Sequence, residues 1–109
     1  MAGRDVASVD HPKSLRDIAE REARVKMLRA QHIAPLTQFV EDLRARSGEV
    51  NVPYFDPLDG GVDAECLYVL EAPGPRAVAS GFISRNNPDE TAKNWFELNA
   101  EAGIPGDER

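Results

Sequence analysis

Only one of the 109 residues is a cysteine, Cys66, and only two are histidines, His11 and His32. One thiol cannot form an internal disulfide, and it cannot hold a zinc ion or an iron–sulfur cluster unaided. Neither histidine has a partner at the spacing of metal ligands. The sequence therefore predicts neither a metal site nor a bound cofactor.

Long apolar runs are also missing. Residues 1–10 contain no apolar stretch of signal-peptide length, and no later stretch approaches the length that crosses a bilayer. We therefore expect a cytoplasmic protein that has no membrane partner.

Basic residues are scarce in the second half of the chain. Residues 1–50 contain nine Lys or Arg and eight Asp or Glu, whereas residues 51–109 contain four and eleven, and the net charge is −6. Because non-specific binding to nucleic acid depends on neutralising phosphates, this pattern disfavours it for the chain alone. With 41% hydrophobic and 29% charged residues, the composition is typical of a globular domain. A chain of 109 residues is nevertheless short for a complete α/β enzyme.

The first half predicts two helices. Ser14 is the expected N-cap of the first, and Asp17 completes a pair that resembles a capping box. Apolar residues recur at helical spacing after this point, which predicts an amphipathic helix over 15–31. Pro35 breaks or kinks that helix because it has no N–H to donate. A second apolar helical face follows, and Gly48 is its expected left-handed cap.

The second half predicts a strand, a loop and a helix. Residues 52–61 are rich in proline, glycine and aspartate, which is typical of a loop. Residues 66–70 form an unbroken apolar run, which predicts a strand buried on both faces as in a parallel sheet. Residues 71–89 are expected to be irregular. Pro88 then opens a third helix, which Gly103 ends.

The predicted strand 66–70 lacks a clear partner, apart from a short edge around residues 50–55. Unpaired strand edges promote association, so the chain either pairs with another copy of itself or belongs to a larger domain. The expected fold class is α/β: N-terminal helices followed by the first strand, loop and helix of a parallel sheet, an incomplete domain. Residues 1–13 are expected to be a mobile tail, and residues 14–109 to form that domain.

The loop 71–89 is the expected functional segment. Ligands of open α/β sheets bind at the carboxyl ends of strands, which is where Glu71 falls. Pro73, Gly74 and Pro75 restrict the backbone and let it approach a ligand closely. Glu71 is accordingly either a ligand-site carboxylate or the cap of a turn.

Three further side chains in this loop are candidates for binding. Phe82 either stacks on a planar ring or folds back into the core. Asn86 and Asn87 each offer a donor and an acceptor, which suits an amide or imide edge, although the same residues are common in turns.

Together these residues resemble the uracil-DNA glycosylase superfamily. The most similar branch has a first motif Gly-Glu-Ala-Pro-Gly at the end of its first core strand, and residues 70–74 here read Leu-Glu-Ala-Pro-Gly. A Phe-Val-Gly-Arg-like stretch follows in that branch, and residues 82–85 read Phe-Ile-Ser-Arg before the helix expected at 89–99. The four cluster cysteines, the later strand ending in Asn and the His-Pro-Ser motif of the family have no counterpart here. The resemblance therefore implies the N-terminal portion of the domain.

The resemblance also implies a function in base excision repair of DNA. Such enzymes flip uracil or another deaminated base into a pocket and hydrolyse its N-glycosidic bond. Phe82 would stack on the base, Asn86 would contribute to binding it, and backbone groups of Ala72, Pro73, Gly74 and Pro75 would hydrogen-bond its carbonyls. Glu71 or Asn87 would position the attacking water.

The chain alone is expected to be inactive, because the resemblance covers only part of the family domain. The alternatives are a non-catalytic module that binds a partner or forms a homodimer through the unpaired strand, and a product with no function of its own.

Overall fold

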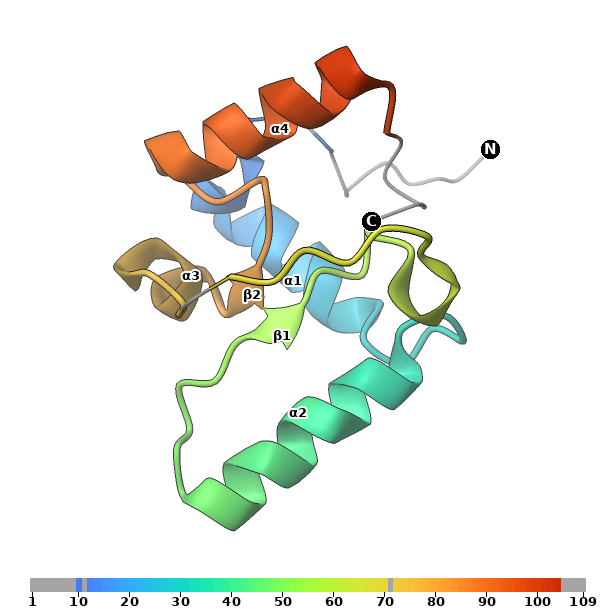
Figure 1. Ribbon diagram of the computed structural model, residues 1–109. Helices are drawn as coiled ribbons and strands as arrows, with labels where there is room; N and C mark the ends of the chain where they lie inside the picture. Colours follow the sequence, from blue (N-terminus) through green and yellow to red (C-terminus); the bar gives the residue numbers. More distant parts are fainter. Residues whose placement is uncertain (1–9, 11, 71, 105–109) are drawn as a thin grey trace.

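The computed structural model describes residues 10, 12–70 and 72–104, which form a mixed α/β domain. Within these residues there are four α-helices, two short 3-10 helices and a two-stranded parallel sheet. In chain order the elements are η1 (Ser14–Arg16), α1 (Ile18–Lys26), α2 (Ala34–Ser47), β1 (Tyr54–Phe55), η2 (Gly61–Asp63), α3 (Pro75–Ser80), β2 (Phe82–Ile83) and α4 (Glu90–Ala102). In Figure 1 the sheet lies between α4 above and α2 below.

The sheet joins two segments that the sequence assigned to loops. β1 and β2 run parallel, with Tyr54 opposite Phe82 and Phe55 opposite Ile83. The N–H of Tyr54 also donates to the carbonyl of Gly81 at 2.8 Å. The edge expected around residues 50–55 therefore exists, but its partner is β2. Strands of two residues are too short to show a periodic pattern, so the sequence alone does not reveal them.

The prediction that residues 66–70 form a buried strand is wrong. In Figure 1 the segment, coloured yellow, runs as an extended coil, and it pairs with no strand among the described residues. Leu67 and Val69 are each 85% exposed, and Leu70 is 60% exposed. An apolar run favours an extended backbone, but burial on both faces requires neighbouring strands, and the described part of the chain does not supply them.

The first predicted helix is shorter than expected and begins later. Ser14 starts the 3-10 turn η1 and is not an N-cap. Asp17 caps α1 instead, since its carboxylate accepts from the N–H of Ala19 at 3.3 Å. Turns follow Lys26, and α2 then begins with Pro35 in its first turn, where the missing N–H costs nothing. Gly48 ends α2 with φ 74°, which confirms the left-handed cap.

Residues 72–89, which the sequence predicted to be irregular, contain α3 and β2. Gly81 ends α3 with φ 86°, a conformation that suits glycine. The third predicted helix is confirmed as α4. Asp89 is its N-cap and accepts from the N–H of Ala92 at 2.7 Å, so Pro88 lies just outside the helix. Gly103 ends α4 with φ 74°, as predicted.

The apolar core lies where η1, the end of α1 and the sheet meet. Leu15, Leu28 and Phe82 are buried against one another, and Tyr54 packs on them. The face of α1 that turns inward also carries Glu20 and Arg24, both buried. Among the residues described, no helix combines the length and apolar character needed to span a membrane.

The apolar residues predicted to share one helical face, Leu15, Ile18, Val25 and Leu28, are only partly buried: Leu15 and Leu28 lie in the core, whereas the two residues inside α1 do not. Ile18 is 66% exposed and Val25 is 56% exposed. The buried face of α1 itself is instead polar, since Glu20 and Arg24 lie on it.

Candidate functional site

A cleft of about 730 Å³ lies between the segment 72–75 and the first two turns of α4. The cleft walls include the end of β2 and the loop after it, through Ile83 and Ser84. Asn87 also lines the cleft. The cleft thus lies beside the carboxyl end of a parallel strand, the position at which open α/β sheets bind ligands.

The structure brings together several residues that the sequence singled out. Ala72, Pro73, Gly74 and Pro75 form one exposed wall of the cleft, and Asn87 lies on another. Glu71, the expected catalytic carboxylate, lies outside the described residues.

The wall 72–75 is open and rigid. Two of its four residues are prolines, which fix φ and carry no N–H, so its N–H donors belong to Ala72 and Gly74. A Cβ built on Gly74 would meet no atom within 4 Å, which leaves space for a ligand against the backbone.

Asn87 lines the cleft, but its amide is engaged within the protein. Its Oδ1 accepts from the hydroxyl of Ser80 at 2.6 Å, and its Nδ2 donates to the carbonyl of Phe82 at 2.9 Å. The side chain is 3% exposed. Asn87 therefore ties the end of α3 to β2, and a ligand that used this amide would have to replace both bonds.

Phe82 lies in the core and not in the cleft. Its side chain is 1% exposed, and its ring centroid lies 6.2 Å from that of Tyr54. Of the two roles that the sequence left open, the structure shows the packing role.

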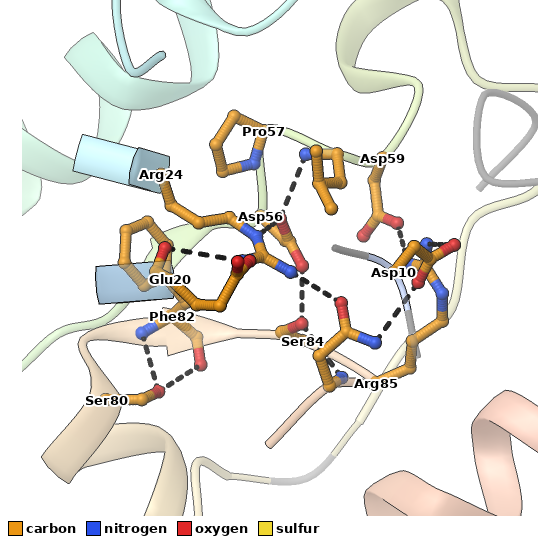
Figure 2. A network of polar contacts seen from close by, with 12 residues as sticks. Asp10, Glu20, Arg24, Asp56, Pro57, Asp59, Ser80, Phe82, Ser84 and Arg85 are labelled. Carbon is orange, nitrogen blue, oxygen red and sulfur yellow. Dashed lines mark hydrogen bonds and ion pairs between the residues drawn. The ribbon is translucent and has the colours of Figure 1, made fainter. Parts of the chain in front are cut away.

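Asn86 bonds to Arg24 and Asp10, two residues of the polar network that Figure 2 shows. Its Oδ1 accepts from Nη2 of Arg24 at 2.6 Å, and its Nδ2 donates to Asp10 at 3.1 Å. Asn86 is 0% exposed, so its amide, like that of Asn87, makes its hydrogen bonds within the protein in this structure.

Arg24 is the centre of this network, and Figure 2 shows it between Glu20 and Asp56. Its Nε donates to Oδ1 of Asp56 at 2.9 Å, and its Nη1 donates to Oε1 of Glu20 at 3.1 Å. The other carboxylate oxygen of Asp56 accepts from the hydroxyl of Ser84. Asp56 follows β1 and Ser84 follows β2, so the network joins the carboxyl ends of both strands to α1.

Arg85 extends the network toward the surface. Its guanidinium pairs with Asp10 at 2.7 Å and with Asp59, and it lies over the ring of Phe96 at 5.9 Å. Burial alone would lower the pKa of Arg85, but the Asp59 and Asp10 carboxylates outweigh it and raise that pKa above its ordinary value. Lys13 makes a further ion pair with Glu90 at 2.7 Å. The described part of the predicted tail is thus attached to the domain at Asp10 and Lys13.

Sequence reasoning missed Arg24 and Asp56. The available signal was weak: Glu20, Arg24 and Leu28 recur every fourth residue and so share one helical face. A charged pair at this spacing is usually a solvated one. Among the described residues, no group of three or more potential ligands is placed to hold a metal ion.

No protein family model, no curated protein and no solved structure matches this chain. The function is therefore inferred from the cleft and from the motif at its wall.

Proposed function

We propose that this chain is a uracil-DNA glycosylase-like protein whose cleft receives uracil or another deaminated base of DNA. The observation that carries the proposal is that Ala72, Pro73 and Gly74, which resemble the end of the first motif of that family, line a single cleft with Pro75 and Asn87. The reaction of the family is hydrolysis of the N-glycosidic bond, the first step of base excision repair.

The exposed wall suits the polar edge of uracil. Uracil is planar and presents two carbonyl oxygens and one N–H. The N–H groups of Ala72 and Gly74 have no acceptor among the described residues and can donate to a carbonyl of the base. The backbone carbonyls of Ala72 and Pro73 can accept from its N–H, whereas that of Gly74 already accepts from the N–H of Val78 at 3.1 Å. Pro73 and Pro75 hold these groups in place, and the space at Gly74 lets a flat ring approach them.

The chemical step requires a positioned water. Its oxygen forms a bond to the sugar C1′, the bond from C1′ to the base breaks, and the electron pair leaves with the base while a nearby carboxylate takes the proton of the water. Glu71 is the proposed carboxylate, next to the binding wall in sequence. Asn87 is engaged with Ser80 and Phe82. We therefore propose that this chain supplies the binding wall and does not turn over substrate by itself.

The test compares two labelled single-stranded oligonucleotides that differ at one position, uracil against thymine. The chain should bind the uracil strand roughly tenfold more tightly, because the cleft must reject one extra methyl group. Fluorescence anisotropy at about 0.15 M ionic strength measures this, since salt screens the repulsion between DNA and a chain of net charge −6. Equal binding of both strands, without excision, would contradict the proposal.

The variant Gly74→Val tests whether the wall 72–75 is responsible for the preference for uracil. The valine would project into open space, so the urea midpoint of unfolding should not change while the preference for uracil is lost. Excision is measured on the same samples by alkaline cleavage, with Glu71→Ala beside the wild type. Excision that disappears in Glu71→Ala would place the complete reaction, and not only binding, in this chain.

A non-catalytic dimerisation module is the second candidate, favoured by one observation. Leu67 and Val69 are each 85% exposed on an extended segment that has no strand partner among the described residues. An apolar groove of about 760 Å³ lies next to this segment, and Phe39, Leu43 and Leu70 contribute to its lining. Extended apolar segments of this kind pair readily with a second copy.

Sedimentation velocity at micromolar concentration tests the dimer. We expect the wild type to sediment as a dimer and the double variant Leu67→Lys/Val69→Lys to sediment as a monomer. Burying either lysine charge in the dimer interface would be strongly unfavourable. Ile18→Lys is the matched control, since Ile18 is 66% exposed on α1, and it should leave the dimer intact. A wild type that stays monomeric over the whole concentration range excludes this candidate.

A further inference from the structure

Two aromatic side chains line the same cleft as the wall 72–75. Tyr68 and Trp95 both contribute to its lining. Their ring centroids are 5.3 Å apart at an interplanar angle of 73°, an edge-to-face arrangement. The hydroxyl of Tyr68 donates to Oδ1 of Asn99, which fixes the ring against α4. Tyr68 is nevertheless 37% exposed, so part of the pair remains accessible.

Tyr68 and Trp95 offer a ligand in the cleft an aromatic surface, which Phe82 was predicted to provide and does not. Phe82 is 1% exposed in the core, and a ligand in the cleft cannot stack on it. A flat ring between the wall 72–75 and α4 would meet Tyr68 and Trp95 instead. Aromatic rings bind nucleobases by stacking on their faces, whatever the base.

Two donors beside this pair also lack an acceptor. Trp95 Nε1 and Asn99 Nδ2 are buried and have no hydrogen-bond partner among the described residues. Both belong to residues that Tyr68 contacts, one helical turn apart on α4. A buried donor without an acceptor is unfavourable. If Tyr68 moved slightly and a carbonyl oxygen of a ligand reached these donors, the hydrogen bond formed would offset the free-energy cost of that movement.

We infer that Tyr68 and Trp95 form the stacking wall for the base in this cleft, with Trp95 as its main binding residue. The inference rests on the proposed function, because it names how that function holds its base. The expected ligand is a pyrimidine with exocyclic carbonyls. Its ring face can stack on the aromatic pair, and its carbonyl oxygens can accept from Trp95 Nε1 and Asn99 Nδ2.

The test uses the intrinsic fluorescence of Trp95, which is the one tryptophan in the sequence. Deoxyuridine is the probe, because it is uncharged and avoids repulsion by the acidic chain. Excitation at the red edge of the tryptophan band avoids absorption by the probe. We expect saturable quenching, with the same Kd that isothermal titration calorimetry gives. Calorimetric binding without a change in Trp95 fluorescence would overturn the inference.

Variants separate stacking from folding. Trp95→Leu should weaken deoxyuridine binding roughly tenfold, whereas Trp95→Phe, which keeps an aromatic face, should recover most of the affinity. Tyr68→Phe should bind nearly as the wild type, because it keeps the ring, and Tyr68→Leu should bind more weakly. Phe82→Leu should bind as the wild type, since Phe82 lies in the core.

The outcomes distinguish this inference from the proposed function. If calorimetry detects deoxyuridine binding and Trp95→Leu binds equally well, the stacking wall is excluded and the proposed function stands. If calorimetry detects no binding of deoxyuridine to the folded wild type, both fail. If Trp95→Leu does not fold, Trp95→Phe and the wild-type quenching decide between these results.

Discussion

Replacing Arg24 by methionine is expected to lower the free energy of unfolding by about 3–5 kcal/mol. The guanidinium is 0% exposed and pairs with Asp56, which is also 0% exposed. Removing it leaves a buried carboxylate without its cation, and Glu20 and Asn86 lose a partner as well. Domains of this size are stable by only about 5–15 kcal/mol, so this is a large share of the total. Urea denaturation followed by circular dichroism measures the change.

Arg29→Met is the matched control. The Arg29 side chain is 60% exposed and pairs with Glu41 at 2.7 Å on the surface. Exposed pairs contribute at most about 1 kcal/mol, so this variant should unfold close to the wild type. Adding Asp56→Asn to Arg24→Met should recover part of the stability, because it removes the unpaired charge. Equal losses for Arg24→Met and Arg29→Met would mean that the buried network does not hold the fold.

Phe82→Ala is expected to cost about 3–5 kcal/mol, because it empties a buried site in the core. The ring is 1% exposed and packs on Leu15, Leu28 and Tyr54. Phe39→Ala is the control on α2, where the ring is 52% exposed, and its cost should be about 1 kcal/mol or less. Denaturation midpoints of the two variants are compared under the same conditions.

The same variant also separates the two roles that the sequence allowed for Phe82. A ring that stacks on a base contributes little to the stability of the free protein, so its removal would leave the denaturation midpoint almost unchanged. A small stability loss in Phe82→Ala together with lost deoxyuridine binding would return Phe82 to the cleft and contradict the packing role.

The sequence singled out part of the cleft lining, residues 72–75 and Asn87. The wall 72–75 follows from composition, since its prolines fix φ and Gly74 carries no side chain, whatever surrounds them. The roles of Asn86 and Asn87 could not be predicted, because their partners include Arg24, 62 residues from Asn86 in sequence, as well as Ser80 and Phe82. From sequence alone, an asparagine amide that binds a ligand cannot be distinguished from one that bonds within the protein.

The sequence by itself determined the features of this protein that depend on near neighbours. Gly48 and Gly103 end their helices because glycine accepts positive φ, and Asp89 starts α4 because its carboxylate reaches an N–H three residues later. Only the tertiary structure decided which faces are buried. Of the apolar residues that recur at helical spacing, Leu15 and Leu28 are buried and Ile18 is exposed, while Arg24 is buried as well. Arg24 lies inside because its carboxylate and amide partners come from the carboxyl ends of two strands that are paired across a long separation in the chain.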